Sequence, residues 1–241
     1  MILSDMHVHS AFCDGVDTPN ALCEQAVKIG VQNLGIVAHS YVDFDPIGTL
    51  SPDNTKQFID TVNQLKQAYK GKLNVYCGVE LDAMSNISTD DFDYVIGSLH
   101  YVKKDDKVFT FDNGETLFTN GVKEVFNGDY YAFCEKYFEM LADFVVTKKP
   151  DIVGHLDLVT KYNEGNKYFD TTNIRYQNAV KKAVDKMLNI NPYFEVNYGS
   201  VIKGAKRMPY PEKWITDYIL SKNGKLLLST DAHKKENIGK F

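Results

Sequence analysis

The sequence predicts an α/β fold in which parallel strands close into a barrel. Short apolar segments alternate with longer helical patterns about seven times along the chain, which is typical of repeated strand–helix units. Several of these apolar segments are continuous rather than alternating, as expected for strands that are buried on both faces. The chain has 241 residues, of which 44% are hydrophobic, and this length suits one barrel domain over residues 1–241.

The predicted elements follow one another in order. The strands are expected at residues 2–8, 34–39, 73–80, 94–100, 151–155, 193–198 and 225–233. Five helices are expected between them, at residues 21–30, 53–71, 130–149, 171–189 and 211–224. Thr and Ser cap helix N-termini and Pro suits the first helical position, so Thr18-Pro19 and Ser51-Pro52 begin the first two helices, which Gly30 and Gly71 end.

Two stretches need separate interpretation. Residues 101–128 are polar and weakly periodic, and we interpret them as a long loop inserted after the fourth strand, with a small hairpin around 109–118. Long loops on that face of a barrel shape the substrate site. The aromatic-rich segment 130–144 is expected to pack in the core or against a second subunit, in a homodimer.

Composition excludes several classes of protein. The net charge of −5 does not favour nucleic-acid binding. The N-terminus lacks the pattern of a signal peptide, and no apolar run approaches the length of a membrane span. The four cysteines form no CxxC pair, so we interpret them as reduced thiols of a cytoplasmic protein.

The histidines follow one placement rule. His7 and His9 are two residues apart in a strand and therefore point to the same face. All six histidines, and three of the carboxylates, fall at or just past the C-terminal end of a predicted strand. These nine residues are His7, His9, Asp14, His39, Glu80, His100, His155, Asp231 and His233. In a parallel barrel these strand ends meet on the face where active sites are built.

Imidazole and carboxylate side chains suit zinc, iron or manganese. Nine such ligands exceed what one tetrahedral ion uses, so they predict two or three divalent metals, with Glu80 as a bridging carboxylate. Each residue also has a structural interpretation. His100 and His155 could hydrogen-bond the backbone, Glu80 could pair with a lysine, and Asp14 could be a turn residue.

The set of motifs resembles the PHP (polymerase and histidinol phosphatase) superfamily. The motifs are HVH at 7–9 with Asp14, AHS at 38–40, GVE at 78–80, GSLH at 97–100, GHLD at 154–157 and STDAH at 229–233. Their order and spacing cover nearly the whole chain. GSLH followed by a long loop and then DIVGHLDL is most similar to the monofunctional L-histidinol phosphate phosphatases.

This resemblance implies a distorted (β/α)7 TIM-like barrel with a trinuclear metal site. One metal would be held by His7, His9, Glu80 and Asp231, a second by Glu80, His100 and His155, and a third by Asp14, His39 and His233. Many relatives carry histidine where this chain carries Asp14. The family usually continues into a final helix, whereas this chain ends eight residues after His233, as a fragment or with a shortened C-terminus.

The implied function is a metal-dependent phosphomonoesterase that hydrolyses L-histidinol phosphate to L-histidinol in histidine biosynthesis. A metal-bridging hydroxide would attack phosphorus in line. The expected catalytic residues are Asp231, Glu80 and His233, and the expected substrate contacts are Arg207, Ser98 and Asn197. Arg207 is favoured because a guanidinium grips phosphate bidentately. The alternatives are a PHP protein tyrosine phosphatase, a nuclease, and a non-catalytic metal-binding scaffold.

Overall fold

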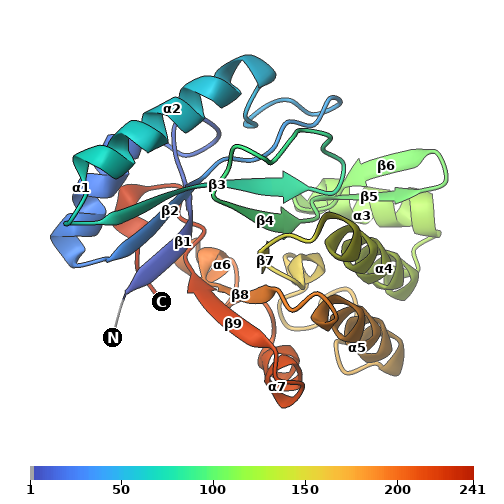
Figure 1. The fold of residues 1–241 in the computed structure, drawn as a ribbon. Helices are drawn as coiled ribbons and strands as arrows, with labels where there is room; N and C mark the ends of the chain where they lie inside the picture. The colour runs from blue at the N-terminus through green and yellow to red at the C-terminus, as the bar shows by residue number, and fades with distance from the viewer. Residues whose placement is uncertain (1–2) are drawn as a thin grey trace.

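Seven parallel strands form a nearly closed barrel in the computed structural model, which describes residues 3–241. Their order is β1(Ser4–His9), β2(Asn33–Val37), β3(Asn74–Asp82), β4(Tyr94–Ser98), β7(Ile152–Val153), β8(Tyr193–Asn197) and β9(Lys225–Ser229) (Figure 1). The gap between β1 and β9 is bridged by backbone hydrogen bonds from His9 N to Ala232 O, 2.8 Å, and from Ala232 N to His7 O, 3.2 Å. The prediction of a parallel barrel is confirmed. Ile2 of the first predicted strand lies outside the described residues.

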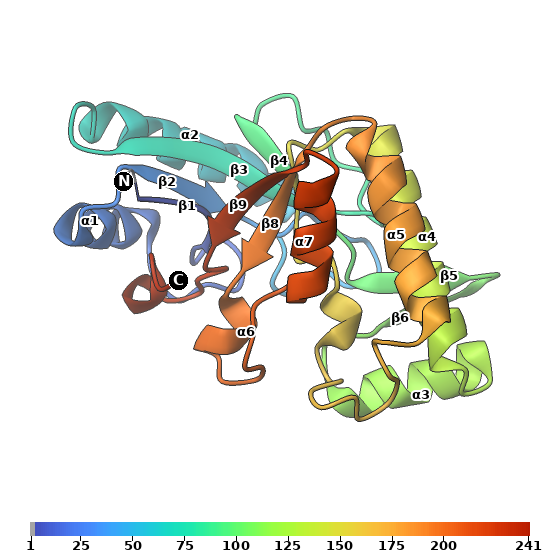
Figure 2. The same ribbon diagram turned by 90° about the horizontal axis from the view of Figure 1, so that it is seen from below.

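Helices cover the outside of the barrel. They are α1(Pro19–Ile29), α2(Pro52–Ala68), α3(Glu115–Phe126), α4(Tyr130–Lys148), α5(Ile174–Leu188), the short α6(Gly199–Ile202) and α7(Lys213–Ser221). Seen from below, α4 and α5 run side by side along one flank, while α1 and α2 lie on the opposite flank (Figure 2). All five predicted helices are present. None of the helices described within residues 3–241 is both long and apolar enough to cross a membrane.

The predicted N-terminal caps are confirmed at α1 and α2, whereas α2 ends at Ala68, with Tyr69 as its C-cap, and not at the predicted Gly71. Thr18 Oγ1 accepts a hydrogen bond from Ala21 N at 3.3 Å, and Ser51 Oγ accepts one from Asn54 N at 3.2 Å. Gly30 ends α1 in the left-handed region with φ 81°, a conformation that glycine adopts without steric cost. The Thr18 and Ser51 side chains each satisfy a backbone N–H group that the first turn of a helix leaves without a partner.

The insertion after β4 differs from the predicted loop. Residues 101–126 form a hairpin, β5(Tyr101–Lys104) with β6(Lys107–Thr110), followed by α3. The hairpin turns at Asp105, whose φ is 54°, and Gly114 of the expected turn instead precedes the first residue of α3. Helix α3 was missed because its apolar face is narrow. Phe118, Val122 and Phe126 are buried on that face, and the surrounding polar residues resemble a loop.

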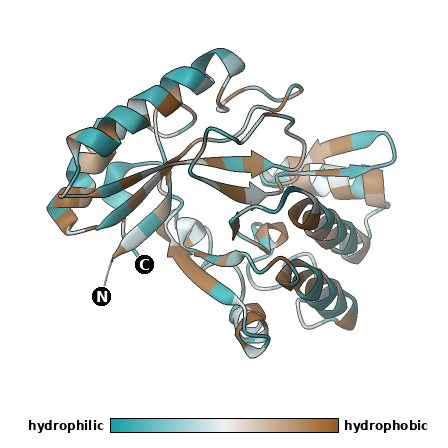
Figure 3. Ribbon diagram, in the orientation of Figure 1, coloured by the Kyte–Doolittle hydropathy of each residue, from teal (hydrophilic) through white to brown (hydrophobic). Residues whose placement is uncertain are grey.

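The aromatic segment of α4 lies in the core, which is one of the two packing arrangements predicted for it. Phe133, Tyr137 and Phe138 are fully buried, and Tyr137 packs edge-to-face on Phe111 from the insertion at 5.3 Å between ring centroids. In Figure 3 this helix carries both apolar and polar residues, as α1 and α2 do. Aromatic burial of this size anchors the insertion to the barrel.

Tyr94 requires glycine on the neighbouring strands. Its ring lies against Gly78 of β3 and Gly35 of β2, and its hydroxyl donates to Met6 O of β1 at 2.6 Å. A Cβ added at Gly78 would lie 2.3 Å from the Tyr94 ring, far inside van der Waals contact. These two glycines therefore make room for the tyrosine.

We expect Gly78→Ala to lower the free energy of unfolding by about 1–3 kcal/mol, because the added methyl group overpacks a close-packed site. Denaturant unfolding of the metal-free protein measures this cost. The cost should shrink when Tyr94 is replaced with leucine in the same chain. An equal cost in both backgrounds would contradict the contact with Tyr94 as its cause.

Candidate metal centre

The carboxyl ends of the strands bring all nine predicted ligands together. β1 supplies His7 and His9, β3 supplies Glu80, and the other histidines follow the ends of β2, β4, β7 and β9. They lie in or beneath a cavity of about 490 Å³ at this mouth of the barrel. Glu80 is at the centre of the cluster and is 1% exposed.

One group of ligands gathers where β1, β3 and β9 meet. Glu80 Oε2 lies 3.3 Å from His7 Nε2 and 3.4 Å from His9 Nε2. Asp231 Oδ1 lies 3.5 Å from His9 Nε2 and 3.9 Å from His7 Nε2. These four side chains are the set expected for a first metal.

The other oxygen of Glu80 faces a second group. Its Oε1 atom lies 2.9 Å from His155 Nε2 and 3.5 Å from His100 Nε2, as the second expected set requires. His39 Nδ1 lies 2.9 Å from Glu80 Oε2. Because this oxygen also faces His7 and His9, His39, assigned only to the third set, adjoins the first set as well. Its ligand atom also lies close to those of Glu80 and His100, which belong to the second set.

A third group surrounds Asp14. Its Oδ2 lies 3.0 Å from His233 Nε2, and its Oδ1 lies 3.5 Å from His39 Nε2 and 3.7 Å from His9 Nδ1. The three expected residues are therefore adjacent, and His9 joins them. The Oδ1 atom of Asp14 therefore lies close to two imidazoles, those of His39 and His9.

The donor set fits divalent cations. Glu80 Oε2 is buried and makes no hydrogen bond of acceptable geometry, although imidazole nitrogens surround it. A buried carboxylate oxygen without a hydrogen bond is costly unless a cation satisfies it. Neutral imidazole and carboxylate are the ligands that zinc, iron and manganese share.

The pKa values of the histidines also indicate a site that attracts cations. Burial alone would lower the pKa of His7, but Glu195, Glu80 and Asp231 raise it well above its usual value. Burial and His39 lower the pKa of His9, yet Cys13 and Asp231 raise it to about 10. Because the carboxylates dominate, the cluster attracts positive charge, as protons or as metal ions.

Metal binding is therefore expected to release protons and to strengthen as pH rises. At pH 7 the raised pKa values keep His7 and His9 protonated in the metal-free protein, whereas a ligating imidazole must be neutral. Calorimetric titration of Zn²⁺ into metal-free protein at pH 7, in PIPES, HEPES and Tris, should show release of about one proton or more per ion. A binding heat that is the same in all three buffers would contradict this.

The structure places the three predicted substrate contacts outside the cavity lining. Arg207 has a side chain that is 92% exposed and pairs with Glu164 at 3.7 Å, away from the cavity lining. Ser98 is buried beside Gly154, and Asn197 is buried with its amide bonded to Glu195 at 3.0 Å. Neither side chain lines the cavity, because both lie beneath the ligands rather than above them.

Two lysines that the sequence analysis did not select line the cavity instead. Lys203 follows α6, and Lys161 lies in the segment after β7. Burial alone would raise the pKa of Asp231, but the charge of Lys203 and the neighbouring imidazoles hold it well below its usual range. One feature of the sequence could have indicated Lys203: it precedes Arg207 by four residues and is therefore closer to the end of β8.

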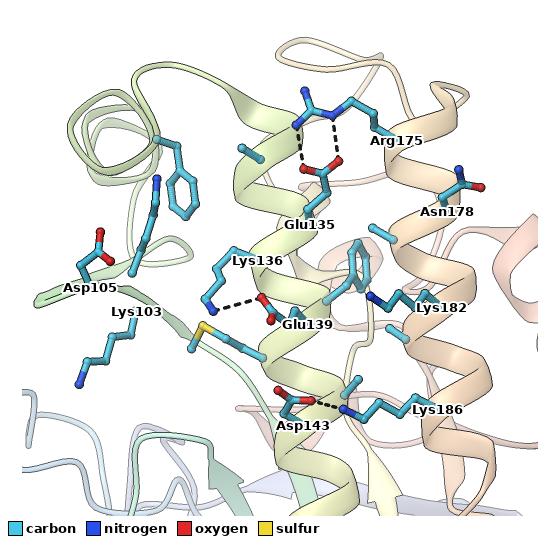
Figure 4. Close-up of a pocket in the computed structure, with 18 of the residues that line it drawn as sticks. Lys103, Asp105, Glu135, Lys136, Glu139, Asp143, Arg175, Asn178, Lys182 and Lys186 are labelled. Atoms are coloured by element: carbon cyan, nitrogen blue, oxygen red, sulfur yellow. Dashed lines mark hydrogen bonds and ion pairs between the residues drawn. The ribbon is translucent and has the colours of Figure 1, made fainter.

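A second, larger hollow of about 1210 Å³ lies between α4, α5 and the hairpin (Figure 4). It contains none of the nine predicted ligands. Several of its charged side chains form ion pairs with one another, as in Arg175 with Glu135 at 2.7 Å and Lys136 with Glu139 at 3.1 Å. The predicted ligands therefore lie at the strand ends and not in this hollow.

A nearly closed parallel barrel with imidazoles and carboxylates gathered at its strand ends defines a class of α/β-barrel metalloproteins. The chain belongs to the PHP domain family, whose sequence model matches residues 5–199. The resemblance to this family is thereby confirmed.

Several relatives of the chain are named histidinol-phosphatase. The chain is 24% identical to the histidinol-phosphatase of Bacillus subtilis over 98% of this chain and 95% of that protein. It is 24% identical to the histidinol-phosphatase of Lactococcus lactis over 66% of this chain and 58% of that protein.

Two solved structures share the fold. A Listeria monocytogenes protein assigned as a histidinol phosphatase superposes with a TM-score of 0.86 at 17% identity, over 98% of this chain and 97% of that one. The histidinol phosphate phosphatase of Lactococcus lactis, solved with zinc, L-histidinol and phosphate, superposes with a TM-score of 0.65 at 18% identity, over 96% and 86%.

Proposed function

We propose that this protein is a metal-dependent phosphomonoesterase that hydrolyses L-histidinol phosphate to L-histidinol and phosphate, a step of histidine biosynthesis. The observation that carries the proposal is the convergence of the eight other predicted metal ligands around the buried Glu80. The shared name of the relatives, and the zinc, L-histidinol and phosphate bound by the Lactococcus lactis protein, support this choice of substrate.

His7, His9, Glu80 and Asp231 would hold one ion, with the remaining ligands holding one or two more. Bound ions would neutralise the phosphate oxygens and lower the pKa of a coordinated water, which supplies the nucleophile. Asp231 stays ionised because Lys203 and His7 hold its pKa well below its usual range, so it can accept a proton but not donate one. Among the candidate catalytic residues, we assign Asp231 the role of proton acceptor.

His233 and Glu80 complete the expected catalytic set. The Nδ1 atom of His233 lies 2.9 Å from Asp231 O, and its Nε2 atom lies 3.0 Å from Asp14 Oδ2. We infer that this pair of contacts orients the ring toward the cavity. Glu80 reaches imidazoles with both oxygens, and so we assign it the bridging role.

A phosphatase assay tests the proposal directly. Protein loaded with Zn²⁺ or Mn²⁺ should release phosphate from L-histidinol phosphate, and EDTA should abolish this release. Faster turnover of phosphotyrosine peptides would favour a tyrosine phosphatase, and cleavage of nucleic acid would favour a nuclease. Bound metal without turnover of any phosphoester would favour a non-catalytic scaffold.

Lys203 takes over the phosphate-binding role first assigned to Arg207. We expect Lys203→Ala to raise the KM for L-histidinol phosphate by about 10–100-fold, the loss of one charged hydrogen bond of about 1.5–3 kcal/mol. Metal content should stay unchanged, because Lys203 is not a ligand. Steady-state kinetics and elemental analysis measure the two quantities.

Arg207→Ala is the matched control for the loss of a cation from the same segment. Its KM should stay within about twofold of the original value, because the Arg207 side chain is 92% exposed. A large rise in KM for Arg207→Ala, with none for Lys203→Ala, would reverse the assignment.

We also infer a cytoplasmic enzyme that does not bind nucleic acid, while the homodimer expected from the sequence stays a prediction. The four free cysteines fit a reducing compartment, and the net charge of −5 disfavours a phosphate backbone as partner. Light scattering of the purified protein tests the dimer, and gel-shift titration with DNA and RNA tests the absence of binding.

A further inference from the structure

Glu195 of β8 is a buried carboxylate that belongs to none of the predicted ligand sets. It is 1% exposed, and both of its oxygens are engaged. Oε1 faces His7 Nδ1 at 2.5 Å and accepts a hydrogen bond from Ser229 Oγ. Oε2 accepts hydrogen bonds from His155 N at 2.7 Å and from Asn197 Nδ2 at 3.0 Å.

No lysine or arginine of residues 3–241 forms an ion pair with Glu195, so its charge is balanced from elsewhere. Among the described residues its one ion-pair partner is the His7 imidazole, whose other nitrogen lies 3.3 Å from Glu80 Oε2. This arrangement of carboxylate, imidazole and ligand cluster is the one by which proteins fix a metal-ligating histidine from behind. The buried charge of Glu195 is therefore explained by the cluster in front of His7.

Glu195 contacts two predicted ligands directly and is connected to a third through Asn197. Glu195 contacts the His7 ring from β1 and the backbone N–H of His155 after β7. It also holds the Asn197 amide, whose Nδ2 atom lies 3.4 Å from Asp231 Oδ2 after β9. The other outer acceptors each face a single ring: Asp82 lies 3.1 Å from His100 Nδ1, and Cys13 Sγ lies 3.4 Å from His9 Nδ1.

We propose that Glu195 is the positioning residue of the metal centre, fixing His7 with its proton on Nδ1 and aligning His7, His155 and Asp231 from three strands. Nε2 of His7 is then free of a proton and faces the other ligands. The inference rests on the proposed metal centre but not on the identity of the substrate.

Glutamine cannot replace Glu195 in this network. If its amide oxygen faces His7, its NH2 group faces the two donors His155 N and Asn197 Nδ2. If the amide is reversed, its NH2 group faces His7 Nδ1, and the ring must carry its proton on Nε2. Either arrangement leaves donors facing each other or places the proton on the ligating nitrogen.

The experiment is competition of the protein with a chelator for Zn²⁺. We expect Glu195→Gln to bind Zn²⁺ about 10–100-fold more weakly than the original protein, while its metal-free form melts as a folded domain. Ser229→Ala, which removes another hydrogen bond to Oε1 and leaves the ring contacts intact, should bind within about twofold. Equal zinc affinity of folded Glu195→Gln and the original protein would overturn the proposal.

A second measurement needs no variant at Glu195. In ¹⁵N-histidine NMR spectra of the zinc-loaded protein, His7 should carry its proton on Nδ1, and a proton on Nε2 would overturn the proposal. If the original protein binds no zinc, the proposed function fails together with this role. Zinc binding that is insensitive to Glu195→Gln refutes the positioning role alone.

Discussion

Replacing Glu80 with glutamine is expected to empty the metal centre and to lower phosphatase activity by about 10³-fold or more. Both oxygens of Glu80 face imidazoles, His155 at 2.9 Å on one side and His7 at 3.3 Å on the other. An amide keeps the shape but loses the charge and turns one acceptor into a donor that faces the ligands. Losing about 4 kcal/mol of charge stabilisation corresponds to about 10³ in rate.

The measurements are elemental analysis for metal content and initial rates with L-histidinol phosphate. Glu124→Gln removes the same charge from an exposed position on α3 and should leave both quantities unchanged. A Glu80→Gln protein that keeps its full metal content would contradict the bridging role. If it keeps the metal but loses activity, Glu80 acts on the substrate instead.

The barrel and its ligand cluster were predictable because they depend on local rules. Continuous apolar segments indicate buried parallel strands, and a histidine that follows such a segment must lie at the common mouth. His7, His39 and His233 are far apart in sequence, yet the strand order brings them together. Ligand placement therefore follows from strand ends alone.

The residues around the ligands could not be assigned in this way. Glu195 and Asn197 lie at the end of β8. The sequence placed Asn197 near the site, but only the neighbouring strands show what the two side chains contact. Arg207 was preferred to Lys203 for the chemistry of its guanidinium, but the position of a loop side chain depends on backbone geometry that sequence does not specify. Helix α3 was not predicted because the polar residues of its outer face resemble those of a loop.

Asp231 offers the second decisive test, because its backbone is unusual. Its φ is 49°, in the left-handed region where asparagine and aspartate are favoured among residues other than glycine. Asp231→Asn therefore preserves the local backbone while it removes the charge and replaces one acceptor oxygen with a donor. Asp231→Ala would add backbone strain, so its effects would mix folding with chemistry.

We expect Asp231→Asn to lower kcat by about 10²–10⁴-fold, the range for loss of a positioned proton acceptor. Because its pKa is held well below its usual range, Asp231 is ionised at neutral pH in the original protein, and the charge removed is a full one. The melting temperature of the metal-free variant should fall, because the positive groups that lower the Asp231 pKa, Lys203 first among them, stabilise the ionised carboxylate in the folded protein. A kcat within tenfold of the original value, with metal bound, would assign proton transfer to another group. The adjacent imidazole of His233, 3.6 Å from Asp231 Oδ1, would then be the group to replace.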